Sequence, residues 1–235
     1  MKTERRLPIP YMLKFMLFVS LFGSLTTLVM MAHSPTPKTD LFLRGPLIGS
    51  TFIVVCAAGI ASALSPRKCS RSFDTHVSNA TFGHESKIVS SVGSKAHHPD
   101  CGRFSNHTIQ FNRRSYCAAC TGLVFGASFA VAISALHFFF GFGTQGSGLL
   151  YVVIGQLGPV IGFIQFKFKG WVRFAANAFF VLGTSLILIG IDQRVGSLFV
   201  DLYVMCLVVF WIMTRITISQ WDHSKICLIC QYQCK

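Results

Sequence analysis

Two groups of cysteine and histidine residues carry the side chains that bind metal ions. The first combines an H-x2-C pair, a 15-residue excursion and a C-x2-C pair, formed by His98, Cys101, Cys117 and Cys120. Structural zinc takes four nitrogen or sulfur ligands in a tetrahedron, and a C-x2-C pair supplies two thiolates one tight turn apart. Because the separations are close to those of zinc fingers, the spacing predicts a zinc site. Within the excursion His107 competes for the place of the fourth ligand, and His97 is a further candidate.

The last thirteen residues hold the second group. Here His223, Cys227, Cys230 and Cys234 follow at intervals of four, three and four residues. One histidine and three thiolates can bind one ion, although so compact a set is strained when it surrounds the ion alone. The two C-x2-C pairs could instead join in one four-thiolate site. The spacing leaves one shared site and two separate sites as alternatives.

Other chemistries of these cysteines are less well supported. The tail pattern C-x2-C-x3-C resembles part of an iron–sulfur motif but lacks the further cysteine and the following proline, so iron ranks below zinc. Neither C-x2-C pair is followed by the His that attaches a c-type haem. Cys117 and Cys120 come just before an apolar stretch, and a helix N-terminus stabilises thiolates for redox chemistry. Since no thioredoxin-like context surrounds them, structural metal binding is favoured over a redox dithiol.

The composition indicates a membrane protein. Hydrophobic residues make up 52% of the chain, Phe occurs 23 times, and only 12% of residues are charged, too few to cover a water-exposed surface. Six apolar stretches have the roughly 17 to 25 residues that cross a bilayer. They are 11–32, 41–64, 118–142, 148–166, 174–191 and 198–218. We therefore expect an all-α polytopic membrane protein with six transmembrane helices, the first retained rather than cleaved as a signal peptide.

The basic residues orient these helices. In a chain with six spans, four segments outside the spans share one side of the membrane: 1–10, 65–117, 167–173 and 219–235. Of the 21 Lys and Arg, 18 lie in these segments or directly beside them. The positive-inside rule makes that side cytoplasmic, so both termini and both Cys/His groups are expected in the cytoplasm, below an inner or plasma membrane. A reducing compartment favours metal binding over disulfides. The net charge of +13 is then explained by basic loops facing an anionic leaflet, without a nucleic-acid partner.

The chain divides into four parts on this basis. They are an N-terminal helical hairpin (1–64), a cytoplasmic loop (65–117) whose ordered metal-binding part is 96–120, a four-helix membrane region (118–218) and a Cys-rich tail (219–235). A loop this short cannot bury enough apolar area to fold alone, so a metal ion would supply the missing stability. Short connections near 141–148 and 192–197 predict antiparallel neighbouring helices.

Polar and small residues inside the apolar stretches have structural interpretations. Gln156 and Asn177 lie midspan and are expected to form hydrogen bonds between helices. Charged residues near the predicted span ends are expected to extend to the interface. These are Lys14, Arg44, Arg173, Asp201 and Arg215. Three G-x-x-x-G pairs, 45/49, 122/126 and 158/162, predict close helix packing.

Three further residue sets complete the sequence predictions. Cys56 and Cys206 are expected to be small core residues. His137 and His33 could meet Asp201 near the outer surface, in a proton or metal site. The rest of the membrane region offers no continuous polar path for a transported ion.

One stretch of the chain resembles a known family. Residues 97–126 include H-H-P-D-C-G-R-F-S-N-H-T-I and then Y-C-A-A-C-T-G-L-V-F-G. This resembles small, uncharacterised prokaryotic membrane proteins, notably archaeal ones, that carry a His/Cys segment followed by C-A-x-C-T-G at the start of a transmembrane helix. The resemblance implies a metal-binding membrane protein and no particular reaction, and Ala119 stands where bacterial relatives have Arg. The matching positions are His98, Cys101, Phe104, His107, Cys117, Cys120 and Gly122.

Together these features predict a non-catalytic integral membrane protein that binds one or two zinc ions. Its expected role is that of an accessory or assembly subunit of a larger membrane complex, or of a docking module for a soluble partner. A membrane redox protein using a Cys117/Cys120 dithiol is the first alternative. A metal transporter or chaperone is the second, although such a protein needs polar residues that continue through the bilayer.

Overall fold

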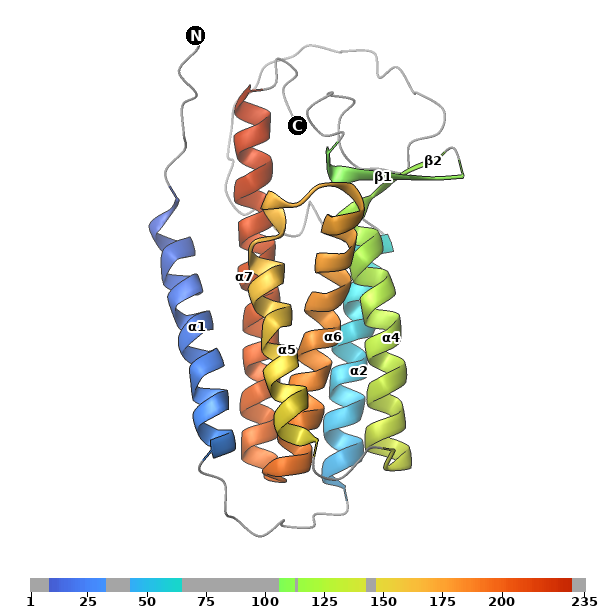
Figure 1. Ribbon diagram of the computed structural model, residues 1–235, viewed down its shortest axis with the longest axis vertical. Coiled ribbons are helices and arrows are strands. Elements are labelled where there is room, and N and C mark those ends of the chain that lie inside the picture. The colour runs from blue at the N-terminus through green and yellow to red at the C-terminus, as the bar shows by residue number, and fades with distance from the viewer. Residues whose placement is uncertain (1–8, 33–42, 65–105, 113, 143–146, 230–235) are drawn as a thin grey trace, which may run out of the picture.

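The structure is a computed structural model that describes residues 9–32, 43–64, 106–112, 114–142 and 147–229, with the side chains of 114 and 227–229 excepted. Six helices stand side by side in this part of the chain (Figure 1). They are α1 (Tyr11–Ala32), α2 (Arg44–Leu64), α4 (Ala118–Phe140), α5 (Gly148–Phe163), α6 (Gly170–Arg194) and α7 (Leu198–Ile229). A short 3-10 turn, η2 (Gln165–Lys167), follows α5, and a hairpin of β1 (Thr108–Phe111) and β2 (Arg114–Cys117) precedes α4.

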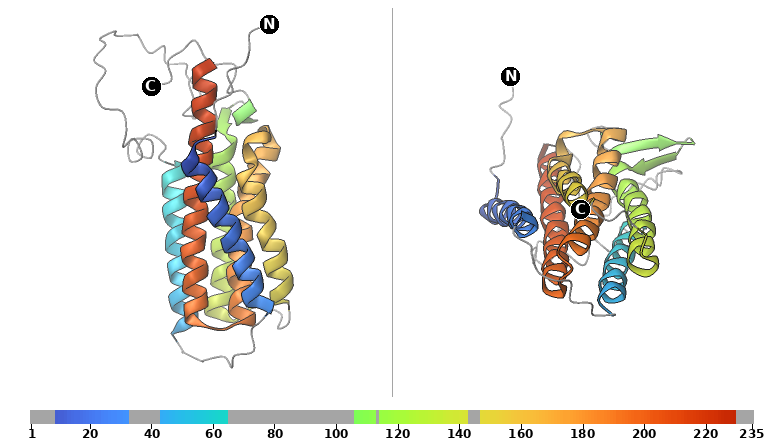
Figure 2. Two further views of the ribbon diagram at one scale, coloured as in Figure 1. Left: turned by 90° about the vertical axis from the view of Figure 1, so that its left-hand side faces the viewer. Right: turned by 60° about the horizontal axis from the view of Figure 1, so that its bottom comes forward.

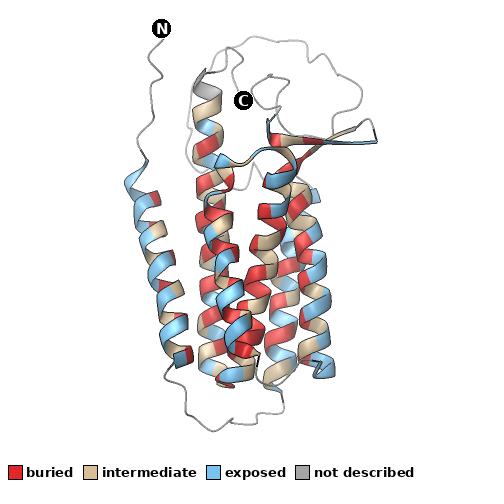
Figure 3. Cartoon of the chain, in the orientation of Figure 1, coloured by how far each residue is buried: buried red, intermediate tan, exposed pale blue. Residues whose placement is uncertain are grey.

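The structure confirms the expected bundle of apolar helices, although it does not show six helices of spanning length among the described residues. Among the described helices five, all except α5, are long and apolar enough to cross a membrane. The 16 residues of α5 span about 24 Å at 1.5 Å per residue, which is less than the roughly 30 Å of a hydrocarbon core. Many large apolar side chains lie exposed on the outside of the bundle, as contact with lipid requires (Figure 3).

The helix bounds differ most from the sequence prediction at α6 and α7, and the structure adds a hairpin. Helix α6 begins at Gly170 rather than near residue 174, and α7 continues to Ile229 rather than ending near 218. The 32 residues of α7 span about 48 Å, so this helix is longer than a bilayer core is thick. The β-hairpin within the predicted loop was not predicted. In its turn Asn112 has a φ of 49°, a left-handed conformation that Asn tolerates better than most residues.

The helices do not pack in the order of the chain. Helix α6 lies between α5 and α4 and makes extensive contacts with both (Figures 1 and 2). The main contacts of α4 are therefore with α6 and α2, and the expectation that α4 and α5 pack as neighbours is wrong. On the other side of the bundle α1 packs chiefly against α7.

Small residues permit the closest of these contacts, as the G-x-x-x-G pairs predicted. A Cβ at Gly126 would lie 2.4 Å from the carbonyl oxygen of Ala178, so α4 touches the backbone of α6 here. Gly183 of α6 packs equally closely on α5, because its Cβ would lie 2.6 Å from the carbonyl oxygen of Gly155. The backbones of α5 and α6 therefore meet without intervening side chains.

Hydrogen bonds between helices hold α1 in the bundle. Gln156 of α5 donates from Nε2 to Oγ1 of Thr27 at 2.5 Å, and the hydroxyls of Ser20 and Thr214 are 3.1 Å apart. The prediction that Gln156 bonds between helices is confirmed.

The bundle has two ends with different chemistry. We call the end that carries the hairpin, the first residues of α4 and α6 and the last turns of α7 the hairpin end. The opposite end, where α2 and α7 begin and α4 and α6 finish, is the distal end (Figure 1).

Candidate metal centre

The hairpin delivers two of the predicted ligands directly to the first turn of α4. Its antiparallel register places Thr108 opposite Cys117, and the chain passes from extended backbone at Cys117 straight into the helix. Cys120 follows in the first turn of α4, three residues later. The C-x2-C pair therefore lies at a helix N-terminus, as the sequence predicted.

Four of the nine predicted ligands line one cavity at the hairpin end. The cavity has a volume of about 80 Å³. Its walls come from the hairpin and from α4, α6 and α7, so the fold joins segments that are more than a hundred residues apart in the sequence. The lining residues are His107, Cys117, Ala119, Cys120, Leu123, Arg173, Arg215, Ser219 and His223.

The two histidines have a separation that suits a shared ion. The ring centroids of His107 and His223 are 5.6 Å apart, and their planes are inclined by 41°. Two imidazoles bound to one tetrahedral zinc through bonds of about 2.0 Å would have centroids roughly 5 Å apart. Within the described residues, however, no three His, Cys, Asp or Glu side chains are already arranged to hold a metal ion.

The other predicted ligands cannot be placed. His98, Cys101, Cys230 and Cys234 lie outside the described residues, as does the further candidate His97. Cys227 belongs to the last turn of α7, but its side chain is likewise outside the described part. Whether the chain has one shared metal site or two therefore stays a prediction.

Arg173 is a cavity residue that the sequence analysis assigned wrongly. Its side chain was expected to extend to the membrane interface, but only 1% of it is exposed. One terminal nitrogen, Nη1, donates to Nε2 of His107 at 3.2 Å, and Nη2 lies 3.6 Å from the carboxylate of Asp222. A buried guanidinium needs such partners, because an uncompensated charge away from water is costly.

Arg215 is the second buried arginine of the cavity. From Nε it donates to the amide oxygen of Asn177 at 3.0 Å, and Nη2 reaches both the same oxygen and Oε1 of Gln165. Both acceptors are neutral amides, so these hydrogen bonds do not balance the charge. The thiolate forms of Cys117 and Cys120 attract Arg215 electrostatically, and they attract Arg173 in the same way.

A sequence signal for this buried face does exist. On α7 the cavity residues Arg215, Ser219 and His223 recur every four residues, which places them on one face of a helix. Arg173 and Asn177 have the same spacing on α6, and Nδ2 of Asn177 donates to the backbone oxygen of Arg173. A polar stripe of this kind facing a neighbouring helix is typical of a buried site rather than of interfacial anchors.

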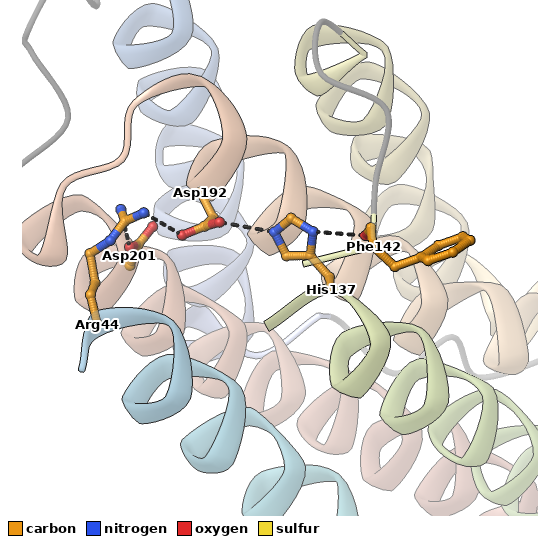
Figure 4. A network of polar contacts seen from close by, with 5 residues as sticks. All are labelled: Arg44, His137, Phe142, Asp192 and Asp201. Atoms are coloured by element: carbon orange, nitrogen blue, oxygen red, sulfur yellow. Dashed lines mark hydrogen bonds and ion pairs between the residues drawn. The ribbon is translucent and has the colours of Figure 1, made fainter. Parts of the chain in front are cut away.

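A second polar network, which we call the distal network, occupies the distal end (Figure 4). Arg44 of α2 forms ion pairs with Asp192 of α6 at 2.8 Å and with Asp201 of α7 at 3.1 Å. Nε2 of His137 on α4 lies 2.9 Å from the other oxygen of Asp192. His137 and Asp201, which the sequence predicted to meet, are therefore linked indirectly, by way of Asp192 and Arg44. His33 lies outside the described residues. Arg44 and Asp201, like Arg173, are internal partners and not interfacial anchors.

The two remaining described cysteines differ from each other. Cys56 is buried as expected, but Cys206 is exposed on the surface of α7, so the prediction of a core position is wrong for Cys206. Neither contributes to the cavity.

No protein-family model, no curated protein and no solved structure matches this chain. The candidate site is thus supported by the motif and by the geometry described above.

Proposed function

We propose that the chain is a non-catalytic zinc-binding membrane protein in which the ion fastens the hairpin and the loop before it to α4 and α7. The observation that carries this proposal is the convergence of His107, Cys117, Cys120 and His223 on one cavity. These are all of the predicted ligands whose side chains are described. Chance would rarely gather two C-x2-C thiols and two distant histidines on a cavity of this size.

Cys117, Cys120 and His223 are the best candidates for three of the ligands. His107 is less suitable in its present position, because its Nε2 accepts a hydrogen bond from Arg173. An imidazole that accepts at Nε2 carries its proton on Nδ1, so neither nitrogen could ligate zinc until that bond is exchanged. His98 or Cys101, only a few residues before His107 in the sequence, would complete the set in its place.

The buried arginines suit a thiolate-rich site. The guanidinium groups of Arg173 and Arg215 can donate charge-assisted hydrogen bonds to thiolate sulfurs. Bound zinc would connect the loop to two transmembrane helices and would contribute directly to folding energy.

The surroundings of the site support a specific topology. We infer six crossings, one of them formed by α5 together with the turn η2 that follows it, and in this topology the hairpin end shares a side with the segments that hold 18 of the 21 Lys and Arg. We propose that this side is the cytoplasmic face of an inner or plasma membrane, with both termini on it. Here a zinc-stabilised hairpin would present a surface to a soluble partner or to other subunits, as in an accessory or assembly subunit of a membrane complex.

The alternative function is redox chemistry by Cys117 and Cys120. It is favoured by the position of both residues at the start of α4 and by the two nearby guanidinium groups, because helix N-termini and cations stabilise thiolates. In the zinc protein the same features would stabilise bound thiolates.

Metal analysis combined with thiol alkylation separates these functions. Purified protein should carry one or two zinc ions, the Cys117→Ser/Cys120→Ser variant should lose at least one, and Cys206→Ser should lose none. Alkylation of Cys117 and Cys120 should be slow until a chelator is added. Metal-free protein as isolated, with rapid alkylation and a reversible Cys117–Cys120 disulfide, would refute the zinc proposal and support the redox alternative. Stoichiometric iron would refute the zinc assignment.

A further inference from the structure

The side chains around the cavity at the hairpin end carry an excess of positive charge. The described part of the chain contains the carboxylates of Asp192, Asp201 and Asp222, and the first two lie in the distal network. Asp222 pairs with Arg173. Arg215 is only 7% exposed, and its acceptors are amide oxygens, which carry no charge. One buried positive charge therefore has no counterpart among the described carboxylates, and such a charge is costly away from water.

The proposed zinc ion would not remove this excess. The thiolates of Cys117 and Cys120 would carry two negative charges, which the two positive charges of Zn²⁺ offset. A hydrogen bond from a guanidinium to a bound sulfur adds no further negative charge. The charge of Arg215 is therefore still unbalanced when these two thiolates hold zinc, and an additional anion would balance it.

The walls of the cavity supply hydrogen-bond donors of the kind that bind an oxyanion. Arg173 is 1% exposed, and its buried Nε has no hydrogen-bond partner within the described residues. On α7, Ser219 lies one turn after Arg215 on the same helical face and also lines the cavity. Guanidinium groups and serine hydroxyls both donate hydrogen bonds to the oxygens of phosphate-type anions.

The N-terminus of α4 adds to this positive field. Cys117 is its N-cap residue, and no side-chain hydrogen bond caps the helix within the described residues. The first N–H groups of a helix have no partners inside the helix, and the helix dipole is positive at this end. Ala119, in the first turn of α4, lines the same cavity as the two arginines. Anions bind where a helix N-terminus and cationic side chains converge in this way.

We propose that this cavity binds one phosphate-type oxyanion between Arg173, Arg215, Ser219 and the first turn of α4. The inference rests on the proposed function in one respect, namely that zinc already balances the charges of Cys117 and Cys120. The cavity volume of about 80 Å³ is about half that of an engineered protein cavity that holds benzene, so it has room for an ion of a few heavy atoms. The bound anion would connect α4, α6 and α7 beside the zinc ion.

Equilibrium dialysis of the full chain against radiolabelled inorganic phosphate, in a detergent buffer without other oxyanions, tests the proposal. Zinc-loaded wild-type protein should bind about one phosphate per chain, and phosphate should raise its melting temperature, because a ligand of the folded state stabilises that state. The Cys117→Ser/Cys120→Ser variant, which has neither thiolate, should still bind phosphate, so this result does not depend on the zinc assignment. Absence of bound phosphate from the zinc-loaded wild type would overturn the proposal, even if the double variant binds it.

Ser219 offers a variant that carries its own anion. Ser219→Asp places a carboxylate in the cavity, so it should abolish phosphate binding and raise the melting temperature in the absence of phosphate. Gln220→Asp makes the same change in net charge at the next residue, which is exposed, and should leave the affinity for phosphate within about twofold of the wild type. Ser219→Ala removes one donor and should weaken phosphate binding about tenfold. Undiminished phosphate binding by folded Ser219→Asp would overturn the proposal.

A lipid headgroup has the same phosphate chemistry as the free ion. The dialysis is therefore repeated with the protein in nanodiscs of phosphatidylcholine, with and without phosphatidic acid. Displacement of the labelled phosphate by phosphatidic acid would support a headgroup phosphate as the ligand, and unchanged binding would support the free ion.

Discussion

Arg215 and Asn177 form a buried pair between α7 and α6, in which the guanidinium donates to the amide oxygen from Nε at 3.0 Å and also from Nη2. Asn177 in turn donates to the backbone oxygen of Arg173, so one amide connects both arginines of the cavity. The side chain of Asn177 is fully buried. It therefore supports the geometry of the candidate metal centre without lining the cavity.

Replacing Asn177 tests this supporting role. Asn177→Leu keeps the number of side-chain heavy atoms but removes the acceptor of a buried cation, so we expect a loss of about 1.5–3 kcal/mol of stability. Thermal unfolding of the detergent-purified protein measures the effect. Ser128→Ala is the matched control, because Ser128 is exposed and bonds only to its own helix, and its change should stay within about 0.5 kcal/mol. Equal unfolding temperatures for the two variants would contradict the structural role of the pair.

Histidine variants distinguish the two imidazoles of the cavity. His223→Ala should lower the bound zinc by about one ion per chain, because we assign His223 to the ligand set. His107→Ala should retain the ion, since Nε2 of His107 is held by Arg173. Elemental analysis after dialysis against a weak chelator provides the measurement. The reverse outcome, with loss only in His107→Ala, would exchange the two assignments.

The glycine contacts of α6 allow a packing test with an internal control. Gly183→Leu inserts a side chain where a Cβ alone would lie 2.6 Å from the carbonyl oxygen of Gly155, so α5 and α6 must separate. Overpacking of this kind costs about 1–3 kcal/mol and often prevents folding. The control is Gly59→Leu on α2, because nothing lies within 4 Å of its Cβ position. Monodispersity and thermal unfolding should distinguish the two variants, and equal behaviour would contradict the close approach of α5 and α6.

Labelling in sealed vesicles tests the proposed topology. Cysteines introduced by Ser90→Cys and Ser224→Cys should react with an impermeant reagent from the cytoplasmic side, and Thr36→Cys should react only from the outside. Mass spectrometry of the labelled peptides distinguishes the introduced cysteines from the native ones. If positions 90 and 224 report opposite sides, six crossings are excluded, and so is a metal site shared by the two C-x2-C pairs.

Local sequence patterns predicted the presence of the helices better than the residues at which they begin and end. Hydropathy depends on neighbouring residues only, so it located all six helices, and the range of α1 was predicted without error. The extension of α7 beyond residue 218 was missed because Arg215, Ser219 and His223 lower the hydropathy while they remain on one helical face. Hydropathy reports the length of the apolar part of a helix, which matches the thickness of the bilayer core. The helix itself can continue beyond that part.

The sequence predicted the candidate ligands of the site but not the residues that surround them. Cys117 and Cys120 could be assigned from spacing, because a C-x2-C pair is a local motif. Arg173 and Arg215 are 42 residues apart, and their meeting depends on the packing of α6 beside α7, which no local pattern encodes. The position of α6 between α4 and α5 was missed for the same reason, since short connections indicate order along the chain rather than contact in space.

Helix α7 contains neither proline nor glycine and runs without a break from Leu198 to Ile229. Asp201 near one end belongs to the distal network, and His223, 22 residues later and about 33 Å away along the axis, lines the cavity at the other. One helix thus supplies a side chain to the polar groups at both ends of the bundle. The axial register of α7 against its neighbours therefore fixes the positions of Asp201 and His223 together.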